Sequence, residues 1–86
     1  MKLVTQPTCR HCHDLKDMLD REGIHYEEVD LTADTEDSKR ARIIAKANKI
    51  RVTPFILYKQ EGYRGVLSYD DIMKKSTSDL MKLSRL

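Results

Sequence analysis

The sequence predicts a single α/β domain over residues 1–86, with the element order β-α-β-α-β-β-α. Three observations support this prediction. A chain of 86 residues has the length of one domain rather than two. Short apolar runs rich in β-branched residues alternate with longer stretches of helical spacing. No internal repeat, low-complexity stretch or linker divides the chain.

The first half of the chain contains two strand–helix units. Residues 2–5 are a short apolar run and predict the first strand. In residues 10–22 apolar side chains recur every three or four positions, which predicts a helix ended by Gly23. Residues 25–31 alternate imperfectly and predict the second strand. A second helix is expected to begin near residue 35 and to end near residue 48 or 49.

The second half predicts a hairpin followed by a helical tail. Residues 55–58 are a continuous apolar run, as in a buried strand, and after a turn at residues 60–62 an antiparallel partner is expected at residues 63–67. Ser68, with an aspartate three positions later, predicts the start of a third helix. Ser76 has the same spacing to an aspartate and could cap a further helix, so the form of the tail stays open.

The composition restricts the function classes. Lys and Arg number 16 against 14 Asp and Glu, so nothing draws the chain to nucleic acid or to a membrane surface. No apolar run approaches the ~20 residues that span a bilayer, and the first residues lack a signal-peptide core. We therefore expect a cytoplasmic protein, and we also expect a monomer. Two cysteines in a reducing compartment indicate metal binding or redox chemistry.

Charge is segregated around the second predicted helix. Residues 27–37 hold six acids and no base, whereas residues 39–51 hold six bases and no acid. Acids at the start and bases at the end of a helix complement its dipole, and this explanation is sufficient. A second interpretation stays open, because four bases follow helical spacing and could form a contact surface: Lys39, Arg42, Lys46 and Lys49.

The strongest chemical signal is the pair Cys9 and Cys12, placed between the first strand and the first helix. A thiolate at a helix N-terminus faces unpaired backbone N–H groups, so its pKa should fall well below the free-thiol value of ~8.5. Arg10 and a protonated His11 would lower the pKa further. Cys9 can then attack a substrate disulfide, and Cys12, one turn inside the helix, can resolve the mixed disulfide.

Three other interpretations of the pair are open. Residues 9–13 also fit the C-x-x-C-H pattern of haem attachment, but that reading needs an exported, helix-dominated protein. Zinc or an iron–sulfur cluster would lack a second cysteine pair within one chain. Two buried, inert cysteines are the last interpretation, and the place of Cys9 in a turn beside Pro7 weighs against it.

The second signal is Thr53-Pro54, directly before the apolar run of residues 55–58. A proline is permitted at the first position of a strand. A cis bond there would let the backbone of Thr53 present its N–H and C=O outward. An ordinary trans proline is the alternative.

With these signals together, the chain resembles the glutaredoxin branch of the thioredoxin-fold redoxins over nearly all of residues 1–75. Residues 7–12 look like the family's Pro-Thr-Cys-Pro-Tyr-Cys segment, and residues 23–30 resemble the stretch that enters its second strand. Thr53-Pro54 matches its cis-proline loop, and residues 69–72 resemble the start of its last helix. The resemblance implies a thioredoxin fold, a four-stranded mixed sheet with helices on both faces.

The resemblance also implies a function, a thiol–disulfide oxidoreductase that reduces protein or glutathione mixed disulfides. Cys9 would be the nucleophile and Cys12 the resolving thiol. Further residues would bind substrate or glutathione: Thr53, Pro54, Arg10, His11, Tyr69 and Asp70. No bound cofactor or metal is expected, and glutathione would be a co-substrate. Client proteins would contain disulfides, and ribonucleotide reductase is a candidate among them.

Three departures from the family pattern bear on the electron donor. Arg10 and His11 replace the usual Pro-Tyr and so change the surroundings of the thiolate. Gln6 stands where the family commonly has a lysine for the glycine carboxylate of glutathione. Leu67 and Ser68 replace a Gly-Gly pair. A flavoprotein reductase such as thioredoxin reductase is therefore an alternative electron donor.

Functions of a different class are open as well. Cys9 from two chains could hold zinc or an iron–sulfur cluster, which would make the protein a non-enzymatic binding module. A redox-inactive adaptor is another alternative, although the presence of both cysteines weighs against it.

Overall fold

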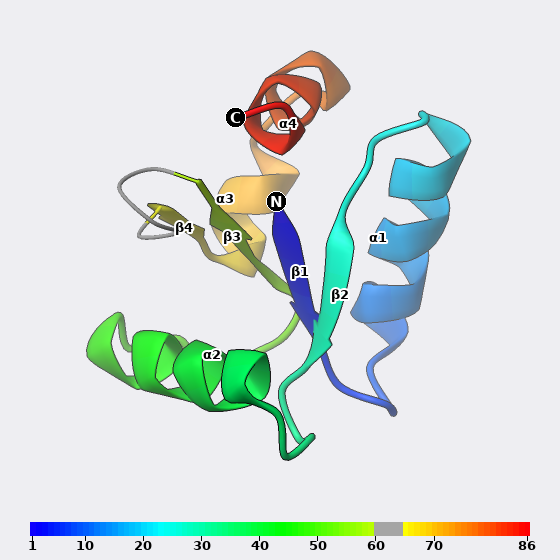
Figure 1. The fold of residues 1–86 in the computed structure, drawn as a ribbon. Coiled ribbons are helices and arrows are strands. Elements are labelled where there is room, and N and C mark those ends of the chain that lie inside the picture. Colours follow the sequence, from blue (N-terminus) through cyan, green and yellow to red (C-terminus); the bar gives the residue numbers. More distant parts are fainter. Residues whose placement is uncertain (60–64) are drawn as a thin grey trace.

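The computed structural model describes residues 1–59 and 65–86, and a four-stranded sheet lies at its centre (Figure 1). The strands are β1 (Lys2–Thr5), β2 (Glu27–Asp30), β3 (Phe55–Tyr58) and β4 (Gly65–Leu67), in the order β2-β1-β3-β4. β1 pairs with β2 in parallel, whereas the other two pairings are antiparallel. The prediction of a mixed four-stranded sheet is confirmed.

Helices join these strands and follow them. They are α1 (Arg10–Arg21), α2 (Glu36–Ala47), α3 (Tyr69–Met73) and α4 (Thr77–Ser84). α2 packs on one face of the sheet, and α1, α3 and α4 contribute to the core on the other (Figure 1). This is the thioredoxin fold that the sequence predicts. Within the described residues no helix has the length and apolar character needed to cross a membrane.

The second strand is shorter than predicted. Residues 25–31 were expected to be extended, but β2 holds only Glu27 to Asp30. The reason is its parallel partner, because β1 offers four residues and the register runs from Lys2 opposite Glu27 to Thr5 opposite Asp30. The predicted turn at residues 60–62 and the first two residues of the predicted strand at residues 63–67 lie outside the described residues.

The structure resolves the form of the tail, which contains two helices rather than one. Ser68 caps α3, and its side chain accepts a hydrogen bond from the backbone N–H of Asp71. Ser76 caps α4 in a full capping box with Asp79, so each serine has the partner that the spacing predicts. Gly23 has a φ of 68°, as expected for a glycine that ends a helix.

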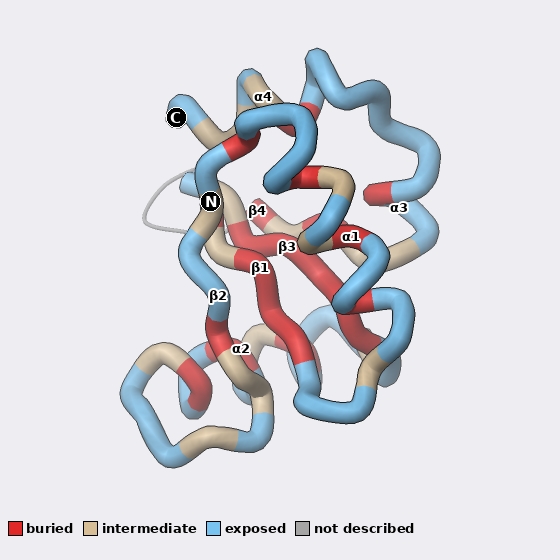
Figure 2. Tube along the Cα trace, turned by 90° about the vertical axis from the view of Figure 1, so that its right-hand side faces the viewer, coloured by how far each residue is buried: buried red, intermediate tan, exposed pale blue. Residues whose placement is uncertain are grey.

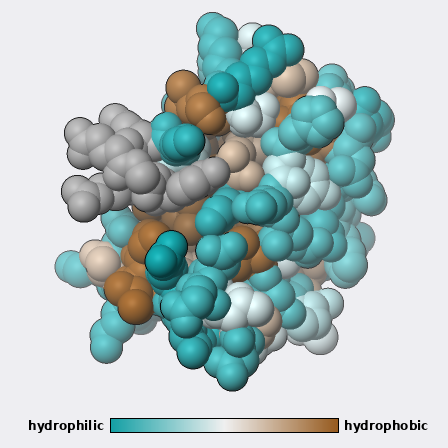
Figure 3. Space-filling view, viewed as in Figure 1, coloured by the Kyte–Doolittle hydropathy of each residue, from teal (hydrophilic) through white to brown (hydrophobic). Residues whose placement is uncertain are grey.

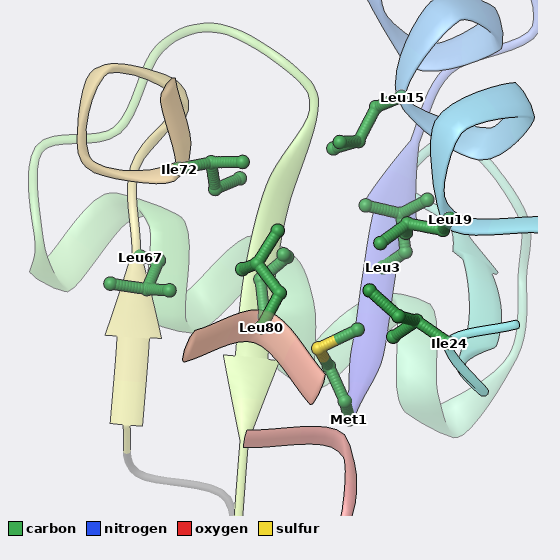
Figure 4. Packing of buried hydrophobic residues seen from close by; sticks show 9 residues of the cluster. Met1, Leu3, Leu15, Leu19, Ile24, Leu67, Ile72 and Leu80 are labelled. Atoms are coloured by element: carbon green, nitrogen blue, oxygen red, sulfur yellow. The ribbon is translucent and has the colours of Figure 1, made fainter. Parts of the chain in front are cut away.

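Two apolar cores lie on opposite faces of the sheet, because successive residues of a strand point to opposite sides. Leu3 belongs to one core and Val4 to the other. Burial is concentrated along β1 and β3 (Figure 2). The larger core joins long aliphatic side chains from three strands, three helices and the residues next to them (Figure 4): Met1, Leu3, Leu15, Leu19, Ile24, Ile56, Leu67, Ile72 and Leu80. The smaller core beneath α2 contains Val4, Val29, Ala41, Ala45, Phe55 and Leu57.

Candidate active site

Cys9 and Cys12 lie at the start of α1, after the short loop that follows β1. The backbone of Cys9 is extended and forms the N-cap of α1, and its Sγ accepts a hydrogen bond from the backbone N–H of Cys12 at 3.1 Å. The two Cα atoms are 5.2 Å apart and the sulfurs are joined in a disulfide. Cys9 is half-buried, whereas Cys12 is 1% exposed. The outer sulfur is therefore the one that a large substrate can reach.

The Thr53-Pro54 segment faces this pair. Its peptide bond is cis, as the sequence interpretation proposed. β3 runs antiparallel to β1 with Phe55 opposite Val4, so the residues before Phe55 meet the residues after β1. The carbonyl oxygen of Thr53 lies 3.5 Å from Cys9 Sγ, within reach of a reduced thiol as donor. The fold thus brings together the two segments that the sequence singled out.

Gln6 has a role at the site that the sequence interpretation missed. Its side-chain Oε1 accepts a hydrogen bond from the Thr53 hydroxyl at 3.2 Å, which ties the end of β1 to the Thr53-Pro54 segment. Sequence reasoning treated Gln6 only as a replacement for a lysine. No local signal in the sequence indicates this contact, because it depends on the antiparallel pairing of β1 with β3, which places the residues that flank both strands side by side.

His11 and Tyr69 form a contact across the site. The Tyr69 hydroxyl lies 3.2 Å from Nδ1 of His11, and the ring centroids are 4.9 Å apart with a tilt of 35°. Tyr69 is the first residue of α3, so this contact joins the α1 end of the site to α3. Both were predicted to bind substrate, but their contact with each other was not predicted.

The side chains of Arg10 and Asp70 are not held at the site by other residues. Both are exposed, Arg10 at the first position of α1 and Asp70 in the first turn of α3. Neither side chain has a hydrogen bond or an ion pair to another residue in the described parts of the chain. Their assignment to substrate binding stays a prediction.

A small polar network supports α1 from the sheet. The hydroxyl of Thr5 donates to Oε2 of Glu28 at 2.8 Å, and Nζ of Lys16 donates to the same oxygen at 3.1 Å. The hydrogen bond from Thr5, and then the hydrogen bond and charge of Lys16, hold the pKa of Glu28 below its ordinary value. The network therefore joins β1, β2 and the helix that carries both cysteines.

The structure offers no group of metal ligands within one chain in its described residues. Nowhere in residues 1–59 and 65–86 do three or more His, Cys, Asp or Glu side chains gather closely enough to hold a metal ion. A metal shared between two chains is a separate hypothesis.

Comparison with known proteins agrees with this geometry. The sequence model of the glutaredoxin family matches residues 1–62, and the chain therefore belongs to the glutaredoxin family. Together with the Cys9–Cys12 pair, membership supports a thiol redox function.

A relative in a phage has a similar sequence. It is the "Gene 56 protein" of Mycobacterium phage D29, which is 38% identical over 50 residues. The alignment covers 58% of this chain and 56% of the phage protein, so the match spans little more than half the length of that relative. No solved structure matches the chain.

Proposed function

We propose that the protein is a thiol–disulfide oxidoreductase that reduces protein or glutathione mixed disulfides through Cys9 and Cys12. The observation that carries this proposal is the position of Cys9 Sγ at the N-cap of α1, 3.1 Å from the backbone N of Cys12. A hydrogen bond from that N–H group and the positive end of the helix dipole stabilise a thiolate more than a thiol. Cys9 is therefore proposed as the nucleophile.

The reaction proceeds in two exchanges. The thiolate of Cys9 attacks one sulfur of the client disulfide, which forms a Cys9–client disulfide and releases the other client sulfur as a thiolate. The Cys12 thiolate then attacks Cys9 Sγ, which forms the Cys9–Cys12 disulfide and releases the second client thiolate. Two electrons pass to the client, and the structure corresponds to the oxidised product.

The Thr53-Pro54 segment is proposed to position the substrate. The Thr53 carbonyl lies beside Cys9 Sγ, so a client strand paired with this backbone would place its own sulfur next to the nucleophile. His11, held against Tyr69, and the exposed Arg10 and Asp70 would contact the client or glutathione around that strand.

Glutathione is the proposed reductant of the enzyme disulfide. Two glutathione thiols would regenerate the dithiol and leave as glutathione disulfide. Leu67 and Ser68 replace the family's Gly-Gly pair, and both side chains are occupied within the protein. Leu67 is buried in the core, and the Ser68 hydroxyl caps α3. By family resemblance, ribonucleotide reductase is a proposed client.

A flavoprotein reductase is the second candidate donor. It is favoured by Gln6, whose side chain is bound to Thr53 and carries no charge for the glycine carboxylate of glutathione.

A coupled assay with a small mixed disulfide tests the proposal and separates the donors. One arm contains glutathione with its reductase, the other contains thioredoxin reductase, and consumption of NADPH is followed. We expect turnover with glutathione, and we expect Cys9→Ser to reduce it to background. Turnover only with the flavoprotein would select the second candidate. No turnover in either arm would contradict the proposal, and a metal assay of the purified protein would then test the binding module.

A further inference from the structure

A pocket of about 360 Å³ lies on the α2 side of the molecule, and neither cysteine lines it. Its lining comes from three segments: the turn directly after β2, the second half of α2 and the loop that leads to β3. Three lining residues are apolar and four are basic: Leu31, Ala45 and Ile50, and Arg42, Lys46, Lys49 and Arg51. On the face seen in Figure 3, apolar surface lies among hydrophilic side chains over the C-terminal end of α2.

The charge of this pocket has one sign. No acidic residue lines it, and the ion pairs found in the described residues, Lys2–Asp37, Lys16–Glu28 and Lys39–Asp34, include none of its four bases. The helix dipole accounts for Lys46, which lies in the last turn of α2. It does not account for Arg51, which follows the helix, or for the apolar lining beside the bases. The helix dipole therefore does not explain the whole lining of this pocket.

Two of the bases are placed by the backbone. Nη1 of Arg42 donates to the carbonyl oxygens of Leu31 at 2.7 Å and Ala33 at 2.9 Å, which fixes the guanidinium against the turn that follows β2. Lys49 has a φ of 56°, the left-handed conformation that usually belongs to glycine or asparagine after a helix. A lysine at such a position adds a cation to the pocket, which asparagine or glycine would not do.

The pocket is close to the proposed site along the chain. Arg51 is separated from Thr53 by Val52 alone, and two extended residues span at most about 7 Å. Val52 is 63% exposed. A client strand that pairs with Thr53 can therefore continue over Val52 and reach the pocket.

We propose that this pocket binds an acidic segment of the client protein, with a carboxylate within about two to four residues of the client cysteine. The carboxylate would meet the four bases, and an apolar neighbour would pack on Leu31 and Ile50. The inference rests on the proposed function, because it assigns the pocket to the client of the same cysteines. It gives the basic residues of α2 a role in selecting clients.

The test compares two peptides with one glutathionylated cysteine each, identical except for Glu or Gln at the second and third positions on both sides. Binding to the oxidised protein is measured by fluorescence anisotropy, and reduction is measured as KM and kcat. We expect the Glu peptide to bind roughly tenfold more tightly, a preference carried by KM and weakened by salt. In Lys46→Glu/Lys49→Glu that preference should disappear, and Lys46→Gln/Lys49→Gln should reduce it.

The matched control is Lys74→Glu/Lys75→Glu, which makes the same change in charge at exposed positions of the α3–α4 turn. It should keep the preference for the Glu peptide. Equal binding of the two peptides by the wild type, or equal loss of preference in both double variants, would overturn the proposal. Peptide binding is measured without turnover. It therefore still tests whether the pocket binds acidic segments, even if the coupled assay shows no activity and the proposed function fails.

Discussion

The two faces of the sheet are built differently. The face toward α1, α3 and α4 is filled with long aliphatic side chains, among them Leu3, Leu19 and Ile56, all with no exposed surface. The core toward α2 is smaller, and the buried side chains that the helix contributes to it are two alanines, Ala41 and Ala45. One core receives buried side chains from three helices, whereas the other is covered by a single helix.

This difference indicates that the two faces have different roles, one in stability and the other in client recognition. Cys12 is buried on α1, beside Leu15 and Leu19, so the packed face fixes the helix whose N-cap is Cys9. The opposite side of α2 keeps its basic residues for solvent and, in our proposal, for the client. We therefore expect changes on the packed face to reduce stability most, and changes on the α2 surface to affect recognition.

The largest effect on stability should come from Leu19→Ala. The side chain is fully buried in the core that supports α1, so its truncation should lower the free energy of unfolding by about 2–5 kcal/mol. Urea denaturation measures the change. Leu86→Ala makes the same chemical change at a leucine that is 60% exposed, and it should have little effect. Similar losses in the two variants would contradict the packing described for this face.

Ala41→Leu tests the face toward α2. Ala41 has no exposed surface and lies in the core between α2 and the sheet. A larger side chain there should displace the helix and lower the free energy of unfolding by about 1–3 kcal/mol. Ala47→Leu places the same side chain at an exposed position of α2 and is the control. If Ala41→Leu were as stable as the wild type in urea, the close approach of α2 would not be required.

A smaller effect is expected at the network that links the sheet to α1. The folded-state pKa of Glu28 is lowered, chiefly by the hydrogen bond from Thr5, so its carboxylate stabilises the protein above the unfolded pKa of 4.5. That contribution is lost as the pH falls through the lower folded-state pKa. Thr5→Val should raise the pKa of Glu28 in an NMR titration and flatten the loss of stability in acid.

The change in stability should stay below about 1 kcal/mol, because the Glu28 side chain is 43% exposed and screened by solvent. Glu28→Gln is the control, since it removes the titrating group. If Thr5→Val still altered the acid dependence in the Glu28→Gln background, another carboxylate would be responsible.

These regions also differ in how far the sequence predicts them. The order of elements and the caps at Ser68 and Ser76 follow from spacings of three or four residues, which are local signals. The Cys9–Cys12 pair is local as well. The ends of β2 depend on the length of its partner β1, and were therefore predicted too widely.

The remaining features of the site are long-range contacts. Gln6 and Thr53 are 47 positions apart, and His11 and Tyr69 are 58 positions apart. The sequence placed three of these four residues in the predicted site by resemblance, but it did not specify how they pair. Side-chain contacts of this kind depend on the tertiary arrangement of strands and helices, which spacing along the chain does not encode.

The central claim is that Cys9 is the attacking sulfur and Cys12 the resolving one. Its most direct test is to incubate the reduced variants Cys12→Ser and Cys9→Ser with glutathione disulfide and to locate the adduct by peptide mass spectrometry. The account predicts a stable glutathione adduct on Cys9 in Cys12→Ser and little adduct on the buried Cys12 in Cys9→Ser. An adduct that forms readily on Cys12 while Cys9 stays unmodified would contradict it.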